Sequence, residues 1–266
     1  MMNRLTNDKR MLKYGLTELY SNIFCFSTTR YGGYSAGAYA TFNCNGYCGD
    51  VPDAVRKNRE LLGSLFPAQG ELIIPHQVHG TEVRVIDEAF LQKSEAERTD
   101  LLEGVDALVS NLPKECLCIS TADCIPVLCY DARHQAIAAI HAGWRGTVAR
   151  IVSKALEKMR QVYGTEGKDV YACIGPGISQ EAFEVGDEVY EAFRQAGFDM
   201  ERIAVRKGKW HIDLWEANRM QLLDFGIEPS HIELSGICTY KNNEDFFSAR
   251  RQGTASGRVL SGIMIV

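Results

Sequence analysis

The chain has 266 residues, of which 45% are hydrophobic and 24% charged, and its formal net charge is −5. This length and composition allow a large core and exclude a disordered chain, and the acidic balance argues against a general nucleic-acid-binding protein, which needs a basic surface. The polar first ten residues lack the pattern of a secretory signal, and no apolar run approaches the ~18 residues of a membrane span. We therefore expect a cytoplasmic protein that binds neither nucleic acid nor membranes, whose nine cysteines are thiols rather than disulfides.

The predicted elements mix strands and helices along the whole chain. Residues 1–20 are expected to be poorly ordered or to form an edge segment, and the charged stretch 87–104 is expected at the surface and partly helical. Strands are predicted near residues 23–29, 72–74, 82–86, 106–110, 117–120, 125–130, 135–140, 170–174, 203–206, 231–234 and 257–266, and helices near 50–65, 148–163, 180–196 and 213–226. Because no linker or change in composition divides the chain, the pattern predicts one mixed α/β domain over residues 1–266.

Two of these strands, residues 125–130 and 135–140, flank a short polar segment and predict a β-hairpin. With the turn centred between residues 132 and 133, the numbers of opposed residues sum to 265, so that Cys124 opposes His141. Opposed residues share a face and have Cβ atoms ~4.5–5.5 Å apart. A thiol and an imidazole are therefore expected to meet at the open end of the hairpin.

His76 and His79 lie upstream at a strand edge and offer a third group. Residues three apart on an extended strand face opposite ways, so only one of the two is expected to point at the thiol. His79, Cys124 and His141 then form a set of two imidazoles and one thiol, the pattern of a catalytic zinc site with an open fourth position.

Three alternatives remain open at this point. With His76 as a fourth ligand the zinc would be structural and closed. Without a metal, Cys124 and His141 would form a nucleophile pair in which the imidazole lowers the pKa of the thiol. The set could also consist of unrelated core side chains.

Two glycine-rich segments carry groups suited to anions. Residues 29–37 form a loop that contains Arg30 and lets backbone approach a ligand. In residues 141–146, Gly143 lies at the start of a predicted helix whose free amides favour negative charge, and Arg145 can pair with an oxyanion or phosphate.

Two further candidates lie elsewhere in the chain. Residues 245–251 place Ser248 and Arg250 beside two phenylalanines, a set that could hold a base and a phosphate or close the core. Asp123 is a candidate acid or base, although on a regular strand its side chain would face away from that of Cys124.

Six motifs occur in the order seen in the bacterial laccase-domain family: Thr29–Ser35, Gln77–Gly80, Thr121–Pro126, His141–Gly146, Gly175–Ile178 and Phe246–Arg251. From about Phe24 to the C-terminus the chain resembles this family, whose members are also named polyphenol oxidase, purine nucleoside phosphorylase and peptidoglycan editing factor. One visible departure is Tyr47-Cys48, where many members carry a histidine, which puts a role for that position in doubt.

The resemblance implies an α+β fold in which two mixed sheets pack together with helices outside, in α/β/β/α layers built from a duplicated β-α-β-β unit. It also implies that His79, Cys124 and His141 bind zinc, with copper as an alternative cofactor, and that His76 lies outside the ligand set.

For activity, the resemblance implies phosphorolysis of adenosine, inosine and methylthioadenosine to free base and ribose 1-phosphate, with adenosine deamination in addition. Nucleoside and phosphate are thus the expected partners. Asp123 would shuttle protons in deamination, and Arg30, Arg145 or Arg250 would hold phosphate.

Other functions are ranked below this one. Copper-dependent oxidation of phenols usually needs several coppers and many more histidines than the six present. A cysteine hydrolase or amidase acting on peptidoglycan precursors would use Cys124 as its nucleophile, and a non-enzymatic module would hold a structural zinc.

Overall fold

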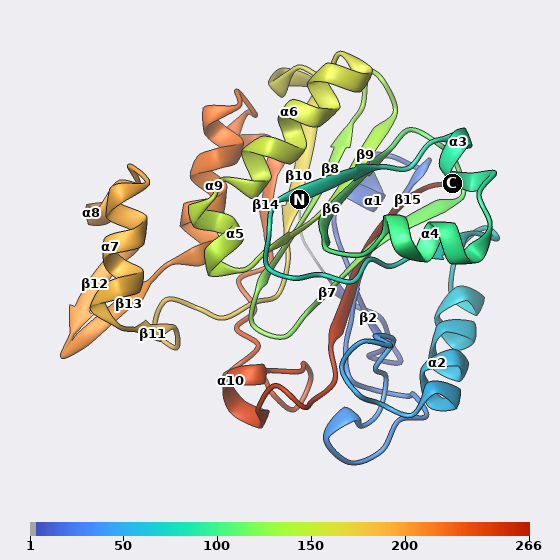
Figure 1. The fold of residues 1–266 in the computed structure, drawn as a ribbon, viewed down its shortest axis with the longest axis horizontal. Coiled ribbons are helices and arrows are strands. Elements are labelled where there is room, and N and C mark those ends of the chain that lie inside the picture. Colours follow the sequence, from blue (N-terminus) through green and yellow to red (C-terminus); the bar gives the residue numbers. More distant parts are fainter. Residues whose placement is uncertain (1–3) are drawn as a thin grey trace.

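Two six-stranded sheets form the centre of the molecule (Figure 1). The computed structural model describes residues 4–266, apart from the side chains of residues 4 and 17. The first sheet contains, in spatial order, β1 (Arg4–Leu5), β2 (Met11–Lys13), β3 (Ile23–Thr28), β15 (Val259–Ile265), β7 (Glu115–Thr121) and β4 (Glu71–Ile73). The second contains β14 (Ile232–Leu234), β10 (Val170–Ile174), β8 (Ile125–Asp131), β9 (Ala136–Ala142), β6 (Val105–Ser110) and β5 (Glu82–Val85). Both are mixed, because β4 runs parallel to β7, and β5 parallel to β6, among otherwise mostly antiparallel pairs.

The two sheets pack face to face and are covered by helices on their outer sides. Alternate residues of both sheets form the core between them, including Ile119 of β7 and Leu128 of β8. On the outer face of the first sheet, Leu62 of α2 (Pro52–Ser64) packs in one cluster with Phe26. The outer face of the second sheet is covered by α5 (Trp144–Val148), α6 (Ile151–Tyr163) and α9 (Leu214–Asp224), whose apolar side chains join those of β8 and β9. The predicted α+β fold with α/β/β/α layers is therefore confirmed, while duplication of a β-α-β-β unit stays a prediction.

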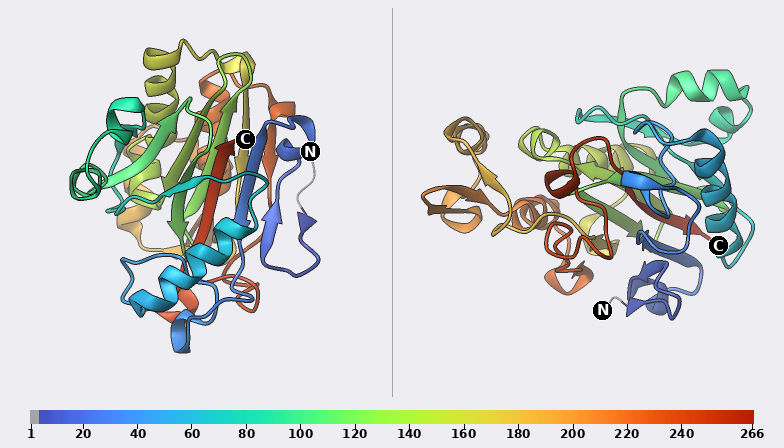
Figure 2. Two further views of the ribbon diagram at one scale, coloured as in Figure 1. Left: turned by 90° about the vertical axis from the view of Figure 1, so that its right-hand side faces the viewer. Right: turned by 90° about the horizontal axis from the view of Figure 1, so that it is seen from below.

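A third, smaller sheet lies at one side of the molecule, seen at the left of Figure 1 and of the right-hand view in Figure 2. It consists of β11 (Glu184–Val185), β13 (Lys209–Ile212) and β12 (Ala204–Lys207), with α7 (Asp187–Gln195) and α8 (Met200–Ile203) beside it. The remaining helices are α1 (Leu16–Leu19), α3 (Glu88–Leu91), α4 (Glu95–Leu101), α10 (Ala249–Gln252) and the 3₁₀ turns η1 (Gly37–Tyr39), η2 (Gly167–Asp169) and η3 (Pro229–His231). Among the helices of the described residues, none combines the length and apolar character needed to cross a membrane.

Most predicted strands are present, and two helix predictions need correction. The helix expected from residue 148 is two helices, because Arg150 adopts a left-handed conformation with φ 61° between α5 and α6. The helix expected from residue 180 begins at Asp187, since residues 184 and 185 pair with β13. The segment expected to be an edge, residues 1–20, supplies β1 and β2 at the edge of the first sheet within the described part.

Candidate functional site

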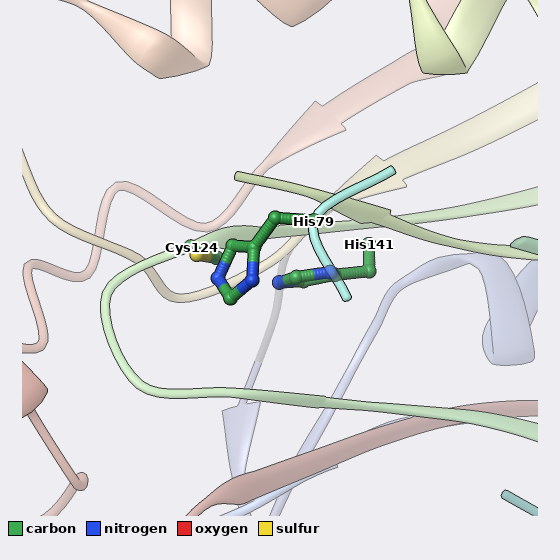
Figure 3. Close-up of side chains that lie close together, drawn as sticks. All are labelled: His79, Cys124 and His141. Carbon is green, nitrogen blue, oxygen red and sulfur yellow. The ribbon is translucent and has the colours of Figure 1, made fainter. Parts of the chain in front are cut away.

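The three predicted ligand residues come from three segments that the topology brings to one end of the interlayer core. The connections from β4 to β5 and from β7 to β8 both cross from the first sheet to the second, and they carry His79 and Cys124. Because β4 and β7 are parallel neighbours, their C-terminal ends lie side by side, and both connections leave the first sheet from that end. His141 lies at the end of β9, which is antiparallel to β8 and so ends where β8 begins. The side chains of all three residues point toward one another (Figure 3).

The hairpin of β8 and β9 differs from the predicted register by two positions. Pro126 pairs with His141, so the numbers of opposed residues sum to 267 rather than 265, and the turn is centred one residue later. A shift of two in this sum leaves every side chain on the same face of the sheet, because side chains alternate with a period of two. Cys124 and His141 therefore still lie on the same face, as predicted, although the predicted register was wrong. Cys124 is diagonal to His141 rather than opposite it.

The donor atoms are close enough to share one ion. One ring nitrogen of each histidine and the Cys124 sulfur all lie within 4.8 Å of one another, and the two imidazole rings have centroids 4.9 Å apart at 71°. Tetrahedral zinc with bonds of ~2.0–2.3 Å needs donor atoms roughly 3.3–3.6 Å apart, which small side-chain adjustments reach. The cluster of His79, Cys124 and His141 is therefore compatible with metal binding.

Asp106 of β6 organises two of the three ligands. It lies opposite His141 across the β6 and β9 pair, and its Oδ1 is 2.7 Å from Nδ1 of His141. A carboxylate partner requires Nδ1 to carry the proton, which leaves Nε2 of His141 as the metal-binding atom. The same carboxylate accepts hydrogen bonds from the backbone amides of Val78, His79 and Gly80 at 3.3, 3.0 and 2.6 Å. One buried side chain thus holds the His79 loop against β6 and orients His141.

Gln77 fixes the His79 loop to the other sheet. Its side-chain amide donates to the carbonyl of Ser120 and accepts from the amide of Ser120, at 2.9 and 2.7 Å. His79 itself has φ 62°, so the backbone turns sharply between the contacts with Asp106 and with Ser120.

His76, on the same loop, lies outside the donor cluster. Its Nδ1 is 2.7 Å from the Glu103 carboxylate, and its ring stacks on Tyr47.

Gly143 provides the space in which the ligands meet. A Cβ atom added there would lie 2.9 Å from Cδ2 of His79 and 3.0 Å from Sγ of Cys124. Its φ of −69° and ψ of 166° are accessible to any residue, so the requirement for glycine at this position is steric rather than conformational. The sequence analysis assigned Gly143 to anion binding, and that role stays a prediction.

Electrostatics favour a thiolate at Cys124. Burial raises the pKa of the thiol, but His141 and then His79 outweigh it and bring the pKa of Cys124 down to about 6. Burial lowers the pKa of His141, whereas Cys124 and Asp106 raise it, and the net pKa of His141 is about 9. Burial raises the pKa of Asp106, while its contacts with His141, Gly80 and Val78 bring it below the ordinary value. A deprotonated sulfur therefore faces the point that a cation would occupy, and the buried Asp106 carboxylate lies behind the His141 ring.

The donor cluster opens into a cavity of about 200 Å³. Beside the three ligands, its wall is formed by residues from the loop after η1, the loop of Gln77, the end of β7, and the segment from α10 to β15: Asn45, Tyr47, Cys48, His76, Gln77, Ser120, Thr121, Ala122, Ala249, Thr254 and Arg258. The donor cluster is thus accessible to a small molecule, and the position with the unusual Tyr47-Cys48 pair belongs to the cavity wall.

The predicted arginines do not line this cavity. The Arg30 guanidinium donates to the carbonyls of Ala40 and Asn243 and lies 4.9 Å from the centroid of the Phe247 ring, so it links three loops. Arg145 is exposed and lies over Trp144. Arg250 is exposed, and its guanidinium donates to the carbonyl of Glu184.

Ser248 and Asp123 hold the C-terminal segment in place. The buried Ser248 hydroxyl accepts from the Arg251 amide at the start of α10. The Asp123 carboxylate accepts from the Thr239 hydroxyl and from the Arg250 amide, each at 2.7 Å. Both contacts anchor residues 239–250 beside Cys124, and substrate-binding or acid–base roles for Ser248 and Asp123 stay predictions.

Sequence reasoning gave no role in the site to Asp106, Gln77, Tyr47 or Arg258. For Asp106 a signal was present, because an acidic residue inside the apolar strand 105–110 calls for a buried partner. Gln77 belongs to one of the six family motifs, but only its hydrogen bonds with the backbone of Ser120 show that it anchors the His79 loop. Arg258 carries no local signal, since it follows a glycine at an ordinary strand start.

Comparisons with known proteins show which family the chain belongs to. A purine nucleoside phosphorylase of Bacteroides thetaiotaomicron is 57% identical over 268 residues, covering 99% of both chains. Adenosine deaminase RL5, from an unknown prokaryotic organism, is 40% identical over 257 residues, covering 94% of this chain and 97% of its own. The crystal structure of the hypothetical protein YfiH of Bacillus licheniformis superposes with a TM-score of 0.90 at 27% identity, covering 99% of both chains. Residues 24–266 match the family described as multi-copper polyphenol oxidoreductase laccase, and the chain belongs to this family.

Proposed function

We propose that the protein is a zinc-dependent purine nucleoside enzyme. It would cleave adenosine, inosine and methylthioadenosine with phosphate to free base and ribose 1-phosphate, and deaminate adenosine in addition. The observation that carries the proposal is the cluster of three donors, His79, Cys124 and His141, in the wall of a cavity. The names of the two relatives described above support both reactions.

Three nitrogen and sulfur donors suit a catalytic rather than a structural zinc, because structural sites are usually closed by four protein ligands. When bound, zinc supplies Lewis acidity and makes water more acidic. Asp106 keeps His141 in the tautomer that binds metal, and the low pKa of Cys124 keeps the sulfur deprotonated near neutral pH. The structure therefore brings the donor set together, and binding of a metal there would release the proton that His141 holds near neutral pH in the metal-free protein.

The cavity also offers an aromatic surface. The Tyr47 side chain is 45% exposed at the cavity wall and is backed by the His76 ring, whose centroid is 4.6 Å away at an interplanar angle of 23°. Aromatic rings of this kind stack on nucleobases with little preference among them. Tyr47 is therefore a candidate stacking surface for the purine of a nucleoside bound in this cavity.

Phosphorolysis exchanges one bond at the anomeric carbon. The bond from C1′ to the purine nitrogen breaks, a phosphate oxygen bonds to C1′, and the departing base takes a proton. For proton transfer, in deamination as well, Asp123 stays the predicted acid or base beside Cys124, although both of its carboxylate oxygens accept hydrogen bonds in the structure.

The test combines metal analysis with product analysis. Purified protein is expected to contain one zinc per chain and to convert inosine to hypoxanthine only when phosphate is present. Cys124→Ser is expected to lose both zinc and turnover, while Cys129→Ser, which alters a buried thiol of the core, is expected to retain zinc. Protein with stoichiometric zinc but no phosphate-dependent hypoxanthine would overturn the proposal.

Two other functions have a specific observation in their favour. The low pKa of Cys124 suits a cysteine hydrolase or amidase, which predicts activity that resists chelators and is abolished by alkylation. The family description names a multi-copper oxidase, yet the described residues hold one such donor cluster, whereas reduction of oxygen to water usually uses several coppers. Copper in the purified protein together with oxidation of phenols would favour that function.

A further inference from the structure

The cavity contains one permanently charged cation. Arg258 is the only lysine or arginine among the described residues that line the cavity, and it is half-buried. Arg258 is therefore the described lining residue whose positive charge an entering anion meets at any physiological pH. None of the three arginines predicted to hold phosphate occupies this place.

The topology of the first sheet puts Arg258 close to the donor cluster. The residue directly after it, Val259, pairs with Thr121 at the end of β7, and Thr121 is three residues before Cys124. The backbone amide of Arg258 donates to Oδ1 of Asn43 at 3.0 Å, which ties it to the loop that carries Cys48. Arg258 therefore lies where the β7 exit, the loop of residues 43–48 and the start of β15 meet.

Local contacts hold the guanidinium and leave one of its edges available. Nη1 donates to the carbonyls of Ser256 and Gly257, and Nη2 donates to the carbonyl of Thr254 at 2.9 Å. Among residues 4–266, Nε of Arg258 has no hydrogen-bond partner, and Nη2 has one acceptor for its two hydrogens. These two donors form the side-on edge of a guanidinium, whose spacing matches two oxygens of one phosphate.

The wall next to Arg258 offers further polar groups. Thr121 is 1% exposed, and its hydroxyl is buried without a hydrogen-bond partner among the described residues. Buried hydroxyls are normally satisfied, so an unpartnered one in a cavity wall calls for a ligand or a water. It belongs to the same β7 exit that approaches Arg258.

We propose that the Nε and Nη2 edge of Arg258 binds inorganic phosphate and presents it to C1′ of the nucleoside. This inference rests on the proposed function and names the residue that positions its second substrate. Arg258 forms no bond in the reaction: it orients the phosphate dianion whose oxygen bonds to C1′ as the purine leaves with its proton. The reverse reaction would use the same contact for the phosphate of ribose 1-phosphate.

The first test uses the wild-type protein without turnover. Zinc-loaded protein is treated with phenylglyoxal, which modifies arginine, and each site is quantified by mass spectrometry with and without inorganic phosphate. Phosphate is expected to slow modification of Arg258 at least fivefold and to leave Arg194, an exposed arginine of α7 paired with Glu191, unchanged. Equal modification of Arg258 with and without phosphate would overturn the assignment.

The second test is kinetic. Arg258→Gln is expected to raise KM for phosphate at least tenfold while KM for inosine changes less than threefold, and the matched Arg194→Gln is expected to change neither. Arg258→Lys keeps the charge but lacks the two-donor edge, so an intermediate KM for phosphate is expected. If Arg258→Gln does not fold, the KM of Arg258→Lys for phosphate is the test. A wild-type KM for phosphate in whichever of the two variants folds would refute the proposal.

The two proposals fail separately. Protection of Arg258 by phosphate without any phosphorolysis would retain the anion site and overturn the proposed function. Phosphorolysis with unprotected Arg258 would retain the function and overturn this inference.

Discussion

Gly143→Ala tests the claim that the metal site depends on a space the size of one methyl group. The added Cβ would lie 2.9 Å from Cδ2 of His79 and 3.0 Å from Sγ of Cys124, which is closer than carbon contacts in proteins normally allow. Because φ and ψ of Gly143 suit alanine, the backbone should not change, and the two ligand side chains must move instead. The substitution therefore acts on the ligands alone.

The expected magnitude follows from the cost of overpacking. Forcing one extra methyl group into a filled site costs about 1–3 kcal/mol. If this cost falls on the metal-bound arrangement, in which the ligands must converge further, the zinc dissociation constant rises about 5- to 150-fold, since 1.4 kcal/mol corresponds to a factor of ten.

The assay is competition for zinc between the protein and a chromophoric chelator at fixed pH. Gly63→Ala is the matched control, because Gly63 lies inside α2 with nothing within 4 Å of an added Cβ. It is expected to bind zinc like the wild type and to be more stable by about 0.5–1 kcal/mol. A Gly143→Ala protein with the zinc affinity of the wild type would show that the ligand side chains do not meet as described.

Three further predictions concern the same site. Asp106→Asn keeps the shape of the side chain but removes the charge that orients His141, so zinc affinity is expected to fall about 10- to 100-fold in the chelator assay; an unchanged affinity would contradict the positioning role. His76→Ala removes a ring outside the donor cluster, so metal analysis is expected to find the same zinc content as in the wild type, whereas loss of zinc would make His76 a ligand. In metal-free protein, the alkylation rate of Cys124 by iodoacetamide should follow an ionisation near pH 6 and fall below that pH, instead of near the usual 9; a midpoint near 9 would argue against the thiolate.

The coupling between Cys124 and His141 also sets the expected effect of pH on stability. The lowered pKa of Cys124 by itself makes stability rise with pH from about 6 to 9, and the raised pKa of His141 by itself makes it fall from about 6.5 to 9. In this window the folded pair holds one proton on His141, and the unfolded pair holds one on Cys124. The number of bound protons is equal, so the pair contributes no slope to the stability of the metal-free protein there.

Local patterns in the sequence determined the strands and the donor set. Apolar alternation identified the hairpin of β8 and β9, and the face shared by Cys124 and His141 depends only on whether the sum of paired residue numbers is odd or even. The error of two in the sum of paired residue numbers therefore left the predicted shared face of Cys124 and His141 unchanged. Alternation allowed only one of His76 and His79 to point at the thiol, the family resemblance implied His79, and the structure brings His79 to the cluster.

Only the tertiary structure decided what surrounds the ligands. Asp106 meets His141 because β6 lies beside β9, and Arg258 approaches Cys124 because β15, the last strand, inserts between β3 and β7. Arg30 looked suited to an anion in its glycine-rich loop, but carbonyls of Ala40 and Asn243, the latter 213 positions away, accept its hydrogen bonds. The conformation of a strand depends on neighbouring residues and can be predicted from them, whereas the partners of a long polar side chain depend on which distant segments the sheet order brings alongside it.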